Sequence, residues 1–166
     1  IIGLGTIGLA TAKIAQALGM KILANRKSDK PMPENIERSS LDRIFEESDF
    51  ISLHCPLAED NEKMVNQARL NQMKPTAFLI NTSRGQLIDE GDLYQALKDH
   101  RIAGAGLDVL TQEPPASDNP LFTLENCHIT PHIAWATQAA RRRLLNTAAE
   151  NLSSWTQGNP VNVVNP

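Results

Sequence analysis

Short apolar segments alternate with helical patterns along the whole of this 166-residue chain. The apolar segments include 50–53 and 76–80, whereas stretches such as 7–18 and 137–155 carry apolar residues three and four positions apart. Strands that alternate with helices through short connections are typical of a parallel sheet covered by helices on both faces. The sequence therefore predicts an α/β fold built on a doubly wound parallel sheet.

The expected elements locate the loops that matter for binding. We expect strands at 1–4, 21–24, 50–53, 76–80, 102–110 and 127–130, and helices at 7–18, 40–47, 66–73, 89–98 and 137–155. Ligands of such sheets bind at the carboxyl ends of the strands. The loops of interest therefore begin at Gly3, Asn25, His54, Asn81, Asp108 and Pro131.

Composition and charge exclude several classes of function. The 16 basic and 19 acidic side chains leave a net charge of −3, which provides no basic surface for nucleic acid or a membrane. No apolar run approaches the roughly 20 residues of a membrane-spanning helix. The two cysteines form no disulfide framework and indicate reduced thiols in a cytoplasmic protein. No group of His, Cys and Asp has the spacing of metal ligands, so no metal is expected.

A glycine-rich turn connects the first expected strand to the first expected helix. It reads GLGTIG and fits the pattern G-x-G-x-x-G in the strand-to-helix context that a dinucleotide requires. Gly3 permits the tight turn, Gly5 lets a pyrophosphate approach the backbone, and Gly8 lets the helix pack closely on the strand. The N–H groups around Thr6 and Ile7 face the anion. The alternative is a glycine turn without a ligand, and this context disfavours it.

The second expected strand ends without the usual acid. Roughly 20 residues after such a turn, an Asp or Glu commonly binds the adenosine ribose 2′-hydroxyl. Here Asn25, Arg26 and Lys27 follow the strand, and no carboxylate comes before Asp29. The two cations suit a 2′-phosphate, and Asn25 suits either group, so we favour NADP(H) over NAD(H). The alternative is that Arg26 and Lys27 are solvated surface charges.

Further motifs follow the other strands in order, and together they point to one family. They are Leu53–Leu57, Asn81–Gly85, Gly106–Val109 with Glu113–Pro115, and Thr130–His132. With the glycine turn, they resemble the D-2-hydroxyacid dehydrogenase family over essentially the whole chain. Segments 131–137 and 160–165 most resemble the branch of glycerate dehydrogenases and hydroxypyruvate/glyoxylate reductases. The resemblance implies a Rossmann-type domain and hydride transfer between a nicotinamide cofactor and a small D-2-hydroxy or 2-oxo acid, such as hydroxypyruvate or glyoxylate.

The resemblance assigns three catalytic residues. The family's arginine falls on Arg84, whose guanidinium would bind the substrate carboxylate and polarise the carbonyl. Its acid/base histidine falls on His132, which would protonate the carbonyl oxygen. Its acidic partner falls on Glu113, which would orient the imidazole and stabilise its charged form.

The resemblance also implies cofactor contacts beyond the glycine turn. Asp108 falls on the residue that binds the nicotinamide carboxamide, although a solvated loop acid is the alternative. Asn61 stands where relatives often have threonine. The other implied contacts are Cys55 and Pro56 near a ribose, backbone groups of Thr82 and Ser83, and the catalytic Arg84 and His132.

The resemblance also bears on domains and partners. It implies that 1–158 is the NAD(P)-binding domain and that the tail 159–166 returns toward a substrate domain. Because the chain begins within a strand, we expect that it lacks the N-terminal part of that domain and turns over poorly by itself. The expected partners are a small 2-oxo or 2-hydroxy acid and a second copy, as a homodimer. A cofactor-sensing binding protein or corepressor on the same fold stays open as the alternative function.

Overall fold

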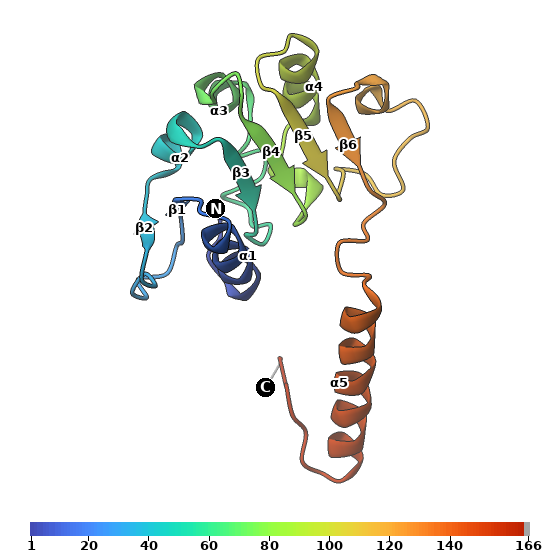
Figure 1. Cartoon of the computed structure of the whole chain (residues 1–166). Coiled ribbons are helices and arrows are strands. Elements are labelled where there is room, and N and C mark those ends of the chain that lie inside the picture. The colour runs from blue at the N-terminus through green and yellow to red at the C-terminus, as the bar shows by residue number, and fades with distance from the viewer. Residues whose placement is uncertain (165–166) are drawn as a thin grey trace. The chain divides into compact units, whose positions relative to one another are not determined.

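A four-stranded parallel sheet forms the centre of the computed structural model, which describes residues 1–164. Its strands lie in the order β3 (Phe50–Leu53), β4 (Phe78–Asn81), β5 (Gly104–Leu107) and β6 (Cys127–Ile129). A second parallel pair, β1 (Ile22–Ala24) and β2 (Ile36–Arg38), lies beside it (Figure 1). Ile2 forms parallel bridges to both Asn25 and Leu53, so it joins the two sheets. The predicted parallel α/β fold is confirmed.

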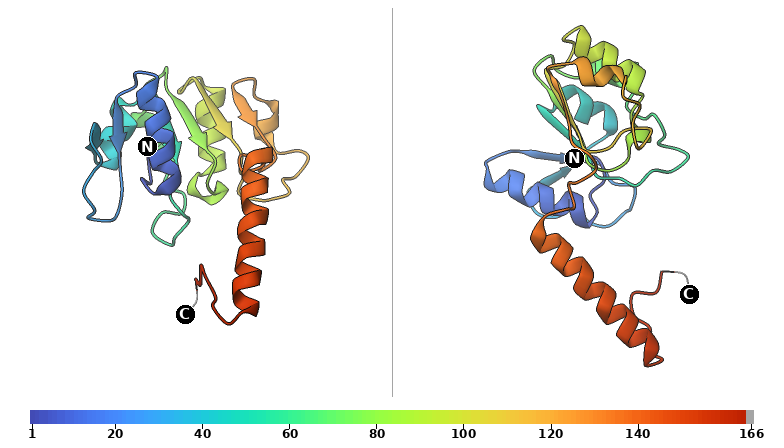
Figure 2. Two further views of the ribbon diagram at one scale, coloured as in Figure 1. Left: turned by 60° about the horizontal axis from the view of Figure 1, so that its bottom comes forward. Right: turned by 90° about the vertical axis from the view of Figure 1, so that its right-hand side faces the viewer.

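Helices cover both faces of this sheet. Helices α2 (Leu41–Glu47), α3 (Gln67–Gln72) and α4 (Glu90–Lys98) pack side by side on one face, and α1 (Thr6–Ala17) lies on the other (Figure 2). Polar side chains begin α2, α3 and α4, because Ser40, Asn66 and Asp89 accept hydrogen bonds from N–H groups of the first turn. Two short 3-10 helices, Gly85–Leu87 and Pro120–Thr123, interrupt the loops.

One strand was not predicted, and another is shorter than expected. β2 has three residues, of which only Ile36 is buried, so it shows no alternation long enough to indicate a strand. The strand expected at 102–110 is confined to Gly104–Leu107. Asp108 therefore lies beyond the end of β5, at the edge where ligands of parallel sheets bind.

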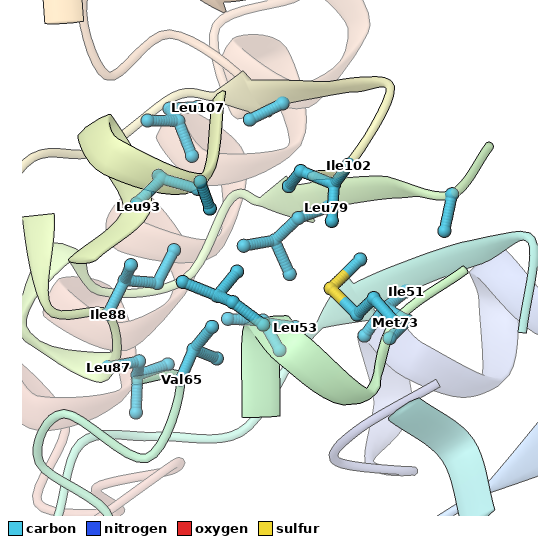
Figure 3. Packing of buried hydrophobic residues seen from close by; sticks show 14 of the residues in the cluster. Ile51, Leu53, Val65, Met73, Leu79, Leu87, Ile88, Leu93, Ile102 and Leu107 are labelled. Atoms are coloured by element: carbon cyan, nitrogen blue, oxygen red, sulfur yellow. The ribbon is translucent and has the colours of Figure 1, made fainter. Parts of the chain in front are cut away.

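The main hydrophobic core lies between the sheet and the three helices that share one face. Ile51, Leu53, Leu79, Ile102 and Leu107 converge from the strands and their connections (Figure 3). A smaller cluster packs beneath α1 and consists of Leu4, Ala12, Ile22, Ala24 and Ile36. Both clusters lie below the loops at the carboxyl ends of the strands, which they support.

The chain divides into two compact units, and the second begins at His132. The first is Ile1–Pro131 and contains both sheets. The second contains α5 (Gln138–Thr156), which Thr137 caps by accepting a hydrogen bond from Ala140 N–H at 3.2 Å. The predicted boundary at residue 158 stays a prediction, and residues 165–166 of the predicted tail lie outside the described residues. Within 1–164, no helix is both long and apolar enough to cross a membrane.

We expect Leu79→Ala to lower the free energy of unfolding by about 2–5 kcal/mol, because it leaves a cavity in a packed core. Leu79 is 0% exposed, whereas Leu152, on α5, is 62% exposed. Urea denaturation of both alanine variants tests this, with Leu152→Ala as the matched control. Equal losses in the two variants would contradict the prediction.

Candidate active site

The glycine turn brings two parts of the chain into backbone contact. A Cβ atom on Gly3, whose φ is +93°, would lie 2.4 Å from the backbone nitrogen of Cys55. A Cβ atom on Gly8 would lie 2.2 Å from the carbonyl oxygen of Gly3. A side chain at either position would therefore displace the turn or the loop after β3.

The same turn leaves open space where a phosphate would sit. A Cβ atom on Gly5 would meet nothing within 4 Å, in contrast to Gly3 and Gly8. No side chain caps the start of α1, so the N–H groups of its first turn have no side-chain acceptor. The N-terminus of a 12-residue helix behind an open glycine fits an anion such as a pyrophosphate.

The loop after β1 holds two cations in different environments. Arg26 donates from Nη1 to the carbonyl oxygen of Pro31 at 3.4 Å, and its buried Nε has no hydrogen-bond partner among the described residues. Lys27 pairs with the carboxylate of Asp60. Asn25 instead donates from Nδ2 to the carbonyl oxygen of Ser39 at 3.0 Å, so its side chain ties β1 to β2. A buried guanidinium nitrogen without an acceptor fits an anionic ligand.

The loop after β3 is stabilised from within. Asn61 is 9% exposed; its Oδ1 accepts from Ala58 N–H and its Nδ2 donates to the Pro56 carbonyl oxygen, both at 2.8 Å. The Asn61 side chain thus shapes the loop, and its predicted contact with the cofactor stays a prediction. Burial raises the pKa of the Cys55 thiol, which keeps it protonated and makes it a poor nucleophile.

The loop after β4 presents Arg84 at the surface. Asn81 is 0% exposed; its Oδ1 accepts from Ser83 N–H at 3.0 Å and its Nδ2 donates to the Arg84 carbonyl oxygen at 2.8 Å. Ser83 Oγ donates to the Cys55 carbonyl oxygen at 2.5 Å, which joins this loop to the one after β3. This supporting role of Asn81 was not predicted, although an Asn directly after a buried strand commonly forms a turn.

Backbone contact also joins the Arg84 loop to the Glu113 loop. A Cβ atom on Gly85 would lie 2.0 Å from the carbonyl carbon of Leu110. Glu113 then folds back, and its Oε1 accepts from Leu110 N–H at 3.2 Å. The structure therefore brings the loops of two of the three predicted catalytic residues together.

Asp108 is buried at the end of β5. It is 4% exposed, and its Oδ1 accepts a hydrogen bond from Thr130 Oγ1 at 2.5 Å. Its own N–H donates to the Asn81 carbonyl oxygen at 2.8 Å. The alternative of a solvated loop acid is wrong, and the predicted contact with the nicotinamide carboxamide stays a prediction.

His132 opens the second unit in an uncommon backbone conformation. Its φ is +53°, in the left-handed region that side chains other than glycine seldom adopt. Its carbonyl oxygen accepts from Trp135 Nε1 at 2.9 Å. Such conformations cluster at functional sites, and here one coincides with the predicted acid/base residue.

A hollow of about 1100 Å³ opens away from these loops. Its lining includes Ile22, Phe50 and Ile80, and none of the predicted site residues. It has no glycine turn and no helix N-terminus without a cap, so we do not assign the cofactor to it.

Comparison with known proteins identifies the class to which this arrangement belongs. Residues 1–134 match the family model for the D-isomer specific 2-hydroxyacid dehydrogenase, NAD binding domain. The chain therefore belongs to this family, and its fold is the Rossmann-type NAD-binding domain.

Particular relatives are reductases and dehydrogenases of small acids. The chain is 49% identical over 167 residues to a hydroxypyruvate reductase of Blautia hydrogenotrophica, covering 99% of this chain and 52% of that one. It is 46% identical to a glyoxylate reductase of Korarchaeum cryptofilum, over 99% of this chain and 51% of the relative. A glycerate dehydrogenase of Methylorubrum extorquens is 45% identical with the same coverage. The chain thus spans about half the length of these relatives.

Solved structures that resemble this chain include one complex with NADPH and another with NAD+. The acyclic imino acid reductase Bsp5 in complex with NADPH and D-Arg superposes with a TM-score of 0.90 at 42% identity, over 99% of this chain and 52% of that one. The D-lactate dehydrogenase of Lactobacillus jensenii with NAD+ superposes with a TM-score of 0.92 at 34% identity, over 99% and 54%. These structures support NAD(P) binding and establish no preference between the two cofactors.

We expect Gly85→Ala to lower the free energy of unfolding by about 1–3 kcal/mol, because a methyl group would separate two packed backbones. Gly106→Ala is the matched control, since a Cβ atom there would meet nothing within 4 Å. Urea denaturation of both variants measures the difference. A Gly85→Ala variant as stable as Gly106→Ala would show that the loops tolerate separation.

Proposed function

We propose that this chain is the cofactor-binding part of an oxidoreductase that interconverts a small 2-oxo acid, hydroxypyruvate or glyoxylate, and its D-2-hydroxy acid. The observation that carries the proposal is the backbone contact between the Arg84 and Glu113 loops through Gly85, at the sheet edge that also holds the glycine turn. Relatives that are named hydroxypyruvate and glyoxylate reductases support it.

Arg84 is suited to bind the acid substrate. Its Nη1 donates to the carbonyl oxygen of Ser83 at 2.7 Å, while the side chain stays exposed on a loop that Asn81 stabilises. A guanidinium keeps its charge at any working pH and matches a carboxylate with two parallel N–H groups. Arg84 would therefore anchor the substrate carboxylate and polarise the adjacent carbonyl.

His132 and Glu113 would carry out the proton transfer that accompanies hydride transfer. A bound reduced nicotinamide supplies the hydride that reduces the carbonyl carbon. His132 donates a proton to the carbonyl oxygen, so that hydride and proton together convert the oxo acid into the hydroxy acid. The role proposed for Glu113 is to stabilise the protonated form of the imidazole, and in the oxidative direction His132 would accept the proton.

The cofactor would lie along the loops after β1, β3 and β5. The glycine turn and the start of α1 would hold the pyrophosphate, and buried Asp108 would hold the carboxamide. We favour NADP(H), and the support is Arg26, whose buried Nε has no partner among the described residues, together with the missing acid after β1. No observation in the described residues favours the alternative of a cofactor-sensing binding protein.

We also propose a homodimer in the cytoplasm. The support for a dimer is the row of exposed apolar side chains on and just after α1, namely Ile7, Ile14 and Leu18, which are 65–73% exposed. Apolar patches of this kind often mark contacts with another protein. The support for the cytoplasm is the pair of unlinked cysteines, Cys55 and Cys127.

We expect Gly5→Ala to weaken NAD(P)H binding at least tenfold without lowering stability, because its methyl group would enter the space reserved for the pyrophosphate and meet no protein atom within 4 Å. Titration of NADPH and NADH by fluorescence, beside a urea denaturation curve, separates the two effects. Gly106→Ala serves as the control. Undiminished binding of both cofactors would rule out this turn as the phosphate site.

We expect Arg84→Ala and His132→Ala each to lower kcat/KM by about 10²–10⁴-fold, as loss of a general acid or a charged anchor commonly does. Binding of NAD(P)H should stay within twofold of wild type. The assay, on the full-length protein, is oxidation of NADPH and NADH with hydroxypyruvate and with glyoxylate.

Two control variants show whether the loss of activity is specific to the Arg84 guanidinium and the His132 imidazole. Arg84→Lys keeps the charge but loses the two parallel N–H groups, so it should also be impaired. His128→Ala removes an exposed histidine of β6 and should leave turnover unchanged. Either alanine variant of Arg84 or His132 with most of its activity would refute the assignment of that residue.

A further inference from the structure

Two loops flank the glycine turn because Ile2 lies between their strands. Ile2 pairs with Asn25 on one side and with Leu53 on the other. The loop after β1 carries Lys27, and the loop after β3 carries Asp60. The Lys27–Asp60 ion pair therefore links the two loops across the end of the sheet where the adenosine ribose of a dinucleotide would lie.

We propose that Asp60 is a specificity-determining residue that reduces the preference for NADP(H), because it holds the Lys27 ammonium that a 2′-phosphate would bind. The inference rests on the proposed binding of a nicotinamide cofactor. A 2′-phosphate has to replace the carboxylate of Asp60 as the partner of Lys27. A 2′-hydroxyl leaves the ion pair intact.

The position of Asp60 is set by its neighbour. Asn61 is 9% exposed, and its side chain binds both Pro56 and Ala58, so two side-chain hydrogen bonds fix the turn that carries Asp60. Asn61 N–H also donates to the Ala58 carbonyl oxygen at 3.1 Å. Asp60 thus lies on a tight, hydrogen-bonded turn. A phosphate that binds Lys27 therefore cannot displace Asp60 by moving its loop.

The charge state of Asp60 supports the competition. Lys27 lowers the pKa of the Asp60 carboxyl, first through the hydrogen bond and then through its charge. Asp60 is therefore ionised at neutral pH, and it repels a phosphate as well as occupying Lys27. Within residues 1–164, Arg26 forms no ion pair and its buried Nε has no hydrogen-bond partner, so it can still attract the phosphate.

The expected effect is modest, because the pair is exposed. The Lys27 and Asp60 side chains are 71% and 64% exposed, respectively. Exposed ion pairs in water change equilibria by about two- to fivefold. We therefore expect Asp60→Asn to raise the ratio of Kd for NADH to Kd for NADPH by about two- to fivefold.

Fluorescence titration of NADH and NADPH tests this on the wild-type chain and four variants. Glu59→Gln is the matched control, since it removes the same charge from the adjacent exposed residue and should leave the ratio unchanged. In a Lys27→Met background, Asp60→Asn should lose at least half of its effect. High salt should reduce the effect too, because it screens exposed charges.

The outcomes separate this inference from the proposed function. If both cofactors bind and Asp60→Asn leaves the ratio unchanged or lowers it, the inference is overturned while the proposed function stands. An effect of full size in the Lys27→Met background, or an equal effect of Glu59→Gln, also overturns it. If neither cofactor binds to the wild-type chain, the proposed function fails first.

Discussion

Backbone segments at the carboxyl edge of the sheet approach so closely that only glycine fits between them. Gly3 lies against the backbone of Cys55, Gly8 against Gly3, and Gly85 against Leu110. In each case a Cβ atom would lie 2.0–2.4 Å from a backbone atom of the partner. These contacts hold the glycine turn against the loop after β3 and the Arg84 loop against the Glu113 loop, and the proposed chemistry depends on them.

Buried polar side chains also stabilise the arrangement of these loops. Asn81 and Asp108 are almost fully buried; the Asn81 side chain binds the backbone of its own loop, and the Asp108 side chain binds Thr130 after the neighbouring strand. Because unsatisfied polar groups are costly to bury, such residues stabilise one loop arrangement over others. The side chains proposed to bind the ligands include Arg84 and Lys27. They are exposed, and the loop that carries Arg84 is one that these buried groups stabilise.

Much of the fold could be predicted from local patterns, and some of the site could not. The helices expected from residues 40 and 89 begin there, and Ser40 and Asp89 cap them, because capping depends on residues only a few positions away. Asn61 and Asn25 were expected to contact the cofactor, which stays a prediction; in the structure the Asn61 side chain binds its own loop, and the Asn25 side chain binds the backbone after β2. An asparagine in a loop can bind either the protein backbone or a ligand. Only the packing around its side chain decides between the two.

The sequence by itself determined the α/β fold and the glycine turn, because glycine spacing and hydrophobic periodicity are local properties of the chain, and its motifs carried the resemblance to the family. The tertiary structure alone decided which distant residues become partners. Gly85 meets Leu110, Thr130 meets Asp108, and Lys27 meets Asp60, all across 20 or more positions. Parallel strands bring their carboxyl ends to one edge, so neighbours there follow the order of strands in the sheet and not the order of residues in the chain.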